Sequence, residues 1–168
     1  RAAIERLRYV PNLTAGSLAS NRSRIVAVVV PTVASSIFSE TIKGLAQTLA
    51  QHRYQLLLGQ TQYRALEEAA LVEAFLGRRV DGLVLAGVAH ARGVRSRLQR
   101  AGIPVVETWD LTARPIDMVV GFSNRAAGHA AARYLTDKGY RPLAFIGGTD
   151  DRSAKRLAGF REGAREAK

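Results

Sequence analysis

Short apolar runs that alternate with helical patterns are the feature of this sequence that most restricts its fold. The first run, Ile25–Val30 (IVAVVV), is continuous and as long as a strand, which is typical of a strand covered on both faces. In the following segment, Ile37–Arg53, apolar residues recur three and four positions apart and predict one buried helix face. A buried strand followed by a helix indicates a βαβ unit.

The same alternation continues along the chain. Further strands are expected at Tyr54–Gly59, Gly82–Ala86, Pro104–Thr108, Met118–Phe122 and Leu143–Gly147, and further helices at Ala65–Leu76, Val94–Ala101, Arg125–Lys138 and Ala154–Ala167. Repeated units of this kind have right-handed crossovers and place their strands in parallel. The sequence therefore predicts an α/β fold with a doubly wound parallel sheet.

Composition restricts the class of protein further. The absence of Cys excludes disulfides and thiolate metal sites, and it fits a reducing compartment such as the cytoplasm. Neither a membrane-spanning run nor a signal peptide is visible. The chain starts at Arg1 and its single Met is Met118, so we expect a native start upstream. A net charge of +11 favours a nucleic-acid partner, although basic composition alone is weak evidence.

Polar and aromatic residues follow the predicted strands. In open parallel sheets the ligand crevice lies at the carboxyl ends of the strands. Hydroxyl groups, amides and aromatic rings at that edge suit a small sugar or sugar acid, because an aromatic face covers C–H groups while polar groups bind hydroxyls. The residues in question include Thr108, Trp109 and Asp110 after one strand, and Phe122 and Ser123 after the next.

Other residue patterns give little support for an enzyme or a metalloprotein. The histidines His52, His90 and His129 are scattered without metal-ligand spacing, so we interpret them as surface or core-edge residues. Glu67 and Glu68 begin a helix, where carboxylates favour the helix dipole. No phosphate loop or nucleophile motif is present. We therefore expect no catalytic activity, no metal and no cofactor.

The stretch before the first strand carries a further motif, Tyr9-Val10-Pro11-Asn12 followed by Ala15 and Leu18. This spacing resembles the hinge of the LacI family of transcriptional repressors. There the motif follows the DNA-binding headpiece, and the resemblance implies that Leu18 inserts into the minor groove of operator DNA, a known means of kinking a duplex. The alternative interpretation of the stretch is an exposed linker, and of the two we favour the hinge.

Motifs in the remaining chain are similar to those of the same family. They are VDGLVLAG, GIPVVE, AGHAAARYLTDKGY, LAFIGG and KRLAGF, in the family's order. The string from PVVETWD to DMVVGFSN most resembles the gluconate-utilisation repressors. One departure is Ser123 before Asn124, where the family usually has Asp.

The resemblance implies a periplasmic-binding-protein-like effector domain of two lobes behind a hinge helix. Residues 1–22 are expected to end the headpiece and form the hinge, residues 23–121 to form the first lobe, and residues 122–168 to begin a truncated second lobe. It also implies a cytoplasmic homodimer on operator DNA, controlled by a gluconate-like effector between the lobes. The alternative is a periplasmic-type sugar-binding protein, which shares the lobe fold but lacks such a hinge.

Site residues follow from matching motifs. The hinge residues expected to contact DNA are Asn12, Ala15, Leu18 and Arg22. The residues expected to contact the effector are Phe38, Thr108, Trp109, Asp110, Phe122, Ser123, Arg152 and Arg156. Among these, Arg156 matches the arginine that pairs with ligand hydroxyls or a carboxylate, and Arg152 is a second candidate for that role. An arginine fork is well suited to hold a carboxylate.

Overall fold

The computed structural model describes residue 6 and residues 22–166. The predicted headpiece end and most of the hinge, including Asn12, Ala15 and Leu18, lie outside the described residues. Within the described part of the chain, no helix is both long and apolar enough to cross a membrane.

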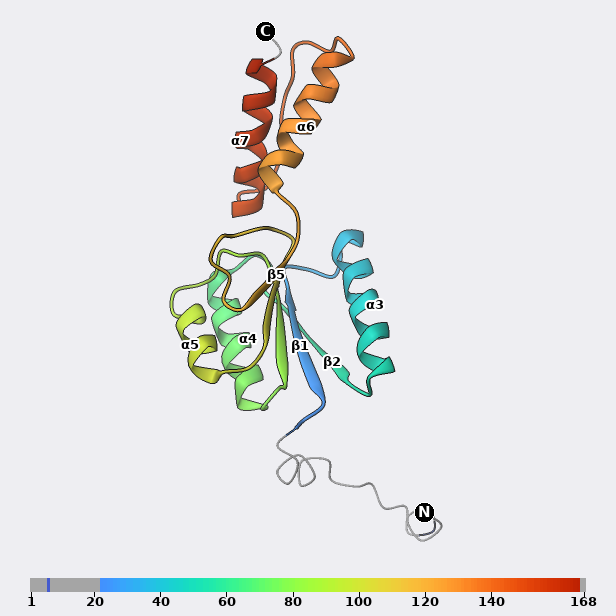
Figure 1. Ribbon diagram of the computed structural model, residues 1–168, viewed down its shortest axis with the longest axis vertical. Coiled ribbons are helices and arrows are strands. Elements are labelled where there is room, and N and C mark those ends of the chain that lie inside the picture. Colours follow the sequence, from blue (N-terminus) through green and yellow to red (C-terminus); the bar gives the residue numbers. More distant parts are fainter. Residues whose placement is uncertain (1–5, 7–21, 167–168) are drawn as a thin grey trace.

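A parallel five-stranded sheet forms the centre of the molecule, in the order β2-β1-β3-β4-β5 (Figure 1). From β1 the chain first forms β2 on one side, and then forms β3, β4 and β5 in turn on the other side. The direction in which strands are added therefore reverses between β1 and β3. Such a reversal opens a crevice at the carboxyl ends of the strands. The strands are β1 (Ile25–Val30), β2 (Gln55–Gln60), β3 (Gly82–Ala86), β4 (Val105–Thr108) and β5 (Met118–Val120).

Helices cover both faces of this sheet, as the sequence predicts for a doubly wound fold. Helices α4 (Ala65–Gly77) and α5 (Val94–Ala101) lie on one face, and α3 (Ser36–Gln51) lies on the other (Figure 1). Side chains alternate between the faces along β1. Ala27 and Val29 belong to the core cluster on the α4 and α5 side, whereas Val28 and Val30 belong to the cluster that contains Phe38 of α3.

Two further helices form a pair beyond the sheet (Figure 1). α6 (Asn124–Asp137) and α7 (Asp151–Glu166) pack along each other, and their backbones come into direct contact at glycines. A Cβ added at Gly128 would collide with the carbonyl oxygen of Arg156, and one added at Gly159 would collide with that of Arg125. Glycine at these positions therefore permits the close approach of the two helices.

The prediction of a strand at Leu143–Gly147 is wrong, because the structure has no strand there. Its side chains are apolar, but Ile146 is 98% exposed. A strand needs a neighbouring strand to satisfy its backbone hydrogen bonds. In the sheet that residues 22–166 form, β5 pairs with β4 and this segment pairs with none of the strands.

β5 is also shorter than expected, since it ends at Val120 rather than at Phe122. The next residue, Gly121, passes so close to Asp110 that an added Cβ would collide with its backbone oxygen. Gly121 therefore permits the segment between β5 and α6 to pass directly against the backbone of Asp110. The domain boundaries proposed from the sequence stay a prediction.

Candidate functional site

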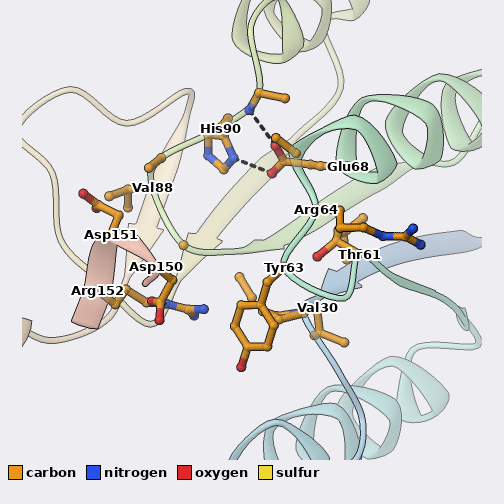
Figure 2. Close-up of a pocket in the computed structure, with 17 residues that line it drawn as sticks. Val30, Thr61, Tyr63, Arg64, Glu68, Val88, His90, Asp150, Asp151 and Arg152 are labelled. Carbon is orange, nitrogen blue, oxygen red and sulfur yellow. Dashed lines mark hydrogen bonds and ion pairs between the residues drawn. The ribbon is translucent and has the colours of Figure 1, made fainter. Parts of the chain in front are cut away.

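A pocket of about 290 Å³ opens at the carboxyl ends of β1, β2 and β3, which is the edge that the topology favours for a ligand (Figure 2). The loops after these strands form its walls, and the first turn of α7 faces them. The lining includes Val30, Thr61, Tyr63, residues 87–91 and Asp150, Asp151 and Arg152.

The loop after β2 is held against β1 by backbone hydrogen bonds. The amide of Thr61 donates to the carbonyl of Val30 at 3.0 Å, and that of Gln62 donates to Pro31 at 2.8 Å. The next residue, Tyr63, has a φ of 60° and is 59% exposed. This turn presents the Tyr63 ring toward the middle of the pocket, opposite Asp150 and Arg152 (Figure 2).

Arg152 supplies positive charge to the pocket. Its guanidinium carbon lies 5.5 Å from the centre of the Phe38 ring, and its Nε lies 3.4 Å from Asp150 Oδ1. The Arg152 side chain is 12% exposed, so these contacts hold it against the pocket wall. An arginine held in this way can bind a carboxylate while its fork is already oriented.

Asp150 orients both Arg152 and the start of α7. Its Oδ2 accepts the hydroxyl of Ser153 at 2.8 Å, and its Oδ1 accepts the Ser153 amide at 3.3 Å. Burial alone would raise the pKa of Asp150, but the Ser153 hydrogen bonds and the charge of Arg152 lower it overall. The carboxylate is therefore ionised at neutral pH and fixes the guanidinium beside it.

Three of the residues predicted to bind the effector form an aromatic cluster next to the pocket. The ring centres of Phe38 and Trp109 are 5.6 Å apart, and those of Trp109 and Phe122 are 5.8 Å apart, both in edge-to-face geometry. Trp109 has a φ of 67°, in the left-handed region. Phe38 is buried and Phe122 is half-exposed.

Other predicted residues connect the sheet to the α6–α7 pair. Oδ2 of the buried Asp110 accepts a hydrogen bond from Lys155 Nζ at 2.5 Å. Arg156 Nη1 donates to Asn124 Oδ1 at 2.6 Å. Asn124 in turn donates to the carbonyl of Trp109 at 2.9 Å. Burial would raise the pKa of Asp110, but hydrogen bonds from Lys155 and Asn124 lower it overall. These contacts attach the starts of α6 and α7 to the loop after β4.

The remaining predicted residues have local partners. The Thr108 hydroxyl donates to the carbonyl of Leu85 at 3.0 Å, and Ser123 caps α6 by accepting the Ala126 amide at 3.1 Å. Arg22 precedes the amino end of β1, at the opposite end of that strand from the pocket. Of the residues predicted to bind the effector, Arg152 lines the pocket and the other seven do not.

Sequence reasoning missed a buried group behind the pocket. His90, interpreted as a surface or core-edge residue, lies between the carboxylates of Glu68 and Glu107 at 2.8 and 2.9 Å. Glu68, to which the sequence assigned no chemistry, and His90 both line the pocket. A signal was available in Glu107, a charged residue inside an apolar strand, but its partners come from distant elements.

Comparisons with known proteins agree with this architecture. Residues 26–167 match the family model of the periplasmic binding protein domain. A transcriptional regulator GntR from Pseudomonas aeruginosa is 37% identical over 99% of this chain and 49% of its own length. Regulator IdnR from Escherichia coli is 29% identical over 94% of this chain and 48% of its own length.

Solved structures give the same result. A LacI-family regulator from Silicibacter pomeroyi is 39% identical, with a TM-score of 0.90 over 98% of this chain and 50% of that one. Regulator GntR from Chromobacterium violaceum is 36% identical, with a TM-score of 0.79 over 86% of this chain and 54% of that one. The chain spans about half the length of the relatives it matches. These relatives are transcriptional regulators and not enzymes.

Proposed function

Because this chain belongs to the LacI family of transcriptional regulators, we propose that it senses a sugar acid and thereby controls the binding of a repressor to operator DNA. The observation that carries the proposal is the pocket at the ends of β1, β2 and β3, with Arg152 held at its wall. Gluconate fits this chemistry, because it combines one carboxylate with a row of hydroxyl groups.

Arg152 is proposed to bind the carboxylate, and the polar groups of Tyr63 and Thr61 to bind hydroxyls. The aromatic cluster and the Asp110–Lys155 pair are proposed to transmit the occupancy of the pocket to α6 and α7, since they join the sheet edge to that helix pair. A ligand can change DNA affinity only through its different affinities for two arrangements of these elements.

The remaining parts of the proposal concern the whole protein. We propose that the hinge residues Asn12, Ala15, Leu18 and Arg22 contact DNA, and that two copies bind a palindromic operator as a cytoplasmic homodimer. The net charge of +11 supports a polyanionic partner. Sequence relatives that are named as transcriptional regulators support the same function.

The test is operator binding by the full-length protein with and without D-gluconate, at one salt concentration because phosphate contacts make affinity salt-dependent. We expect gluconate to change operator affinity in the native protein. Arg152→Ala should weaken gluconate binding about tenfold or more, as expected for loss of a charge-assisted hydrogen bond, without weakening gluconate-free operator binding.

The matched control is Arg97→Ala, which removes an arginine of α5 that pairs with Glu73 on the surface away from the pocket. It should leave both affinities unchanged. Specific DNA binding that ignores gluconate would reject the effector, and absence of specific DNA binding would favour a sugar-binding protein instead.

A further inference from the structure

A histidine bridges two glutamates behind the pocket wall. Nδ1 of His90 lies 2.8 Å from Glu68 Oε1, and Nε2 lies 2.9 Å from Glu107 Oε1. The three side chains are nearly inaccessible, with exposed fractions of 5% for His90, 14% for Glu68 and 0% for Glu107. Ionisable groups withdrawn from water are stable only where their charges and hydrogen bonds are satisfied.

The second oxygen of each carboxylate binds a backbone amide. Glu68 Oε2 accepts the amide of Ala91 at 2.7 Å, and Glu107 Oε2 accepts that of Ile116 at 2.5 Å. Ionised carboxylates are acceptors, so each ring nitrogen that faces one has to carry a proton. With both carboxylates ionised, the ring of His90 is an imidazolium, a state that the raised pKa of His90 favours.

This bridge joins the pocket wall to the sheet. Residues 87–91, which form the loop after β3, all line the pocket, and Glu68 in the first turn of α4 lines it as well (Figure 2). Glu107 lies in β4, and Ile116 precedes β5. The loop has no helix or strand of its own. The Gly87 amide attaches its first residue to the carbonyl of Thr108 at 2.7 Å, and the bridge attaches its other end at His90 and Ala91.

We propose that His90 is a positioning residue for the pocket: its imidazolium holds residues 87–91 in the ligand-binding position, and its deprotonation loosens that wall, so that ligand affinity falls as pH rises. The identity of the ligand rests on the proposed function above. The loosening of the wall does not, because it takes place in the protein without ligand.

The charges around His90 set the direction of this pH dependence. Burial alone would lower the pKa of His90, but hydrogen bonds and charges from Glu68 and Glu107 raise it overall. The bridge is thus complete below the pKa of an unfolded histidine, about 6.5, and is lost as pH rises through the higher folded value. Other charged groups nearby are Arg64 and Glu67 of α4, Arg92 of the loop, Arg95 of α5, Arg114 and Asp117 before β5, and Asp150, Asp151 and Arg152 at α7.

The first measurement is amide hydrogen exchange in the ligand-free full-length protein, expressed as protection factors between about pH 6 and about pH 9. We expect protection of residues 87–91 to fall with rising pH in the native protein. In His90→Gln it should be about tenfold lower at the acidic end and independent of pH. The control His52→Gln, an exposed histidine after α3, should behave as the native protein.

The single substitution His90→Gln leaves the buried carboxylate of Glu107 without its positively charged partner, so a second variant also removes that carboxylate. His90→Gln with Glu107→Gln places a neutral amide pair in the bridge, and it should fold even if His90→Gln alone does not, because no unpaired buried carboxylate remains at Glu107. Protection of residues 87–91 in this variant should again be independent of pH.

The second measurement is titration of D-gluconate by calorimetry over the same pH range. We expect affinity to decrease with rising pH in the native protein and to be flat in both His90 variants. Unchanged protection of the loop in these variants, or protection in the native protein that does not vary with pH, would overturn the proposal. If loop protection falls as expected but the native protein does not bind gluconate, the positioning role is supported and the proposed effector is rejected.

Discussion

Single carboxylates organise several backbone segments of this molecule. The clearest case outside the pocket is Asp81, whose Oδ1 accepts the amide and hydroxyl of Ser23 at 2.7 and 2.9 Å and whose Oδ2 accepts the Arg24 amide at 3.0 Å. Arg24 has a φ of 55°, in the left-handed region. One side chain before β3 thus determines how the chain enters β1.

We expect Asp81→Asn to lower the free energy of unfolding by about 1–2 kcal/mol, since it weakens hydrogen bonds to a charged acceptor. Burial alone would raise the pKa of Asp81, but the bonds from Ser23 and Arg24 lower it overall. The stabilisation is therefore complete above the unfolded value of about 3.9 and is lost as pH falls through the folded one.

Urea unfolding of native protein and variant across the acidic range measures this difference. The control is Asp137→Asn, because Asp137 makes an exposed pair with Arg133 at 3.7 Å that should contribute little. A difference between native protein and Asp81→Asn that stays constant down to the lowest pH would contradict the assigned role of the ionised carboxylate.

At the scale of the elements, the close packing of α6 and α7 depends on residues without side chains. Gly159 faces the backbone of Arg125, and Gly163 faces that of His129. The ion pair of Arg125 with Glu162 and the hydrogen bond between His129 and Glu166 close the same interface at its surface. The pair is therefore organised by backbone contact, with exposed charges at its rim.

Gly159→Ala should destabilise the protein by about 1–3 kcal/mol, because the added methyl group forces the two backbones apart. Gly44→Ala is a matched control in helix α3, where an added Cβ meets nothing within 4 Å. That substitution should instead stabilise by about 0.5–1 kcal/mol, through loss of backbone freedom in the unfolded chain. Chemical denaturation measures both, and equal effects of the two substitutions would disprove the steric argument.

At the scale of the whole molecule, the pocket and Arg22 lie at opposite ends of β1. The pocket adjoins the carboxyl end of that strand, whereas Arg22, the one predicted hinge residue among those that the structure describes, precedes its amino end. The proposed regulation therefore requires effector binding to act over the length of the sheet, through the relative placement of the sheet and the α6–α7 pair.

Leu18→Ala should weaken operator binding and leave the affinity for effector unchanged, because the proposed wedge contacts DNA and not the pocket. Leu18 lies outside the described residues, so this remains a prediction from the sequence. Operator affinity at fixed salt measures it, with Leu66→Ala as the control because Leu66 of α4 is 86% exposed. Operator affinity that is unaffected by Leu18→Ala would exclude the wedge.

Apolar periodicity alone was sufficient to predict the parallel α/β fold and most element positions. Buried strands such as Ile25–Val30 and amphipathic helices can each be recognised from the apolar pattern within their own residues, without knowledge of the elements that pack against them. The segment Leu143–Gly147 has the same strand pattern and fails, because a strand also needs a partner and the pattern carries no information about one.

The sequence placed some of the predicted site residues at the sheet edge where the pocket lies. Strand-end logic and family motifs pointed to Arg152, which lines the pocket, and to Phe38 and Trp109, whose rings pack together beside it; that any of them binds an effector stays a prediction. His90 gave no local signal, since its partners Glu68 and Glu107 are 22 and 17 residues away in sequence.

Apart from Leu143–Gly147, the sequence by itself determined which segments are buried and in what order they form strands and helices, because burial of one face produces a periodic pattern of apolar residues. Only the tertiary structure decided which charges meet: the Glu68–His90–Glu107 bridge, the Asp81 contacts and the Asp110–Lys155 pair. Such contacts depend on how elements distant in sequence are placed relative to one another. That placement sets the distances between side chains, and no local sequence pattern reports it.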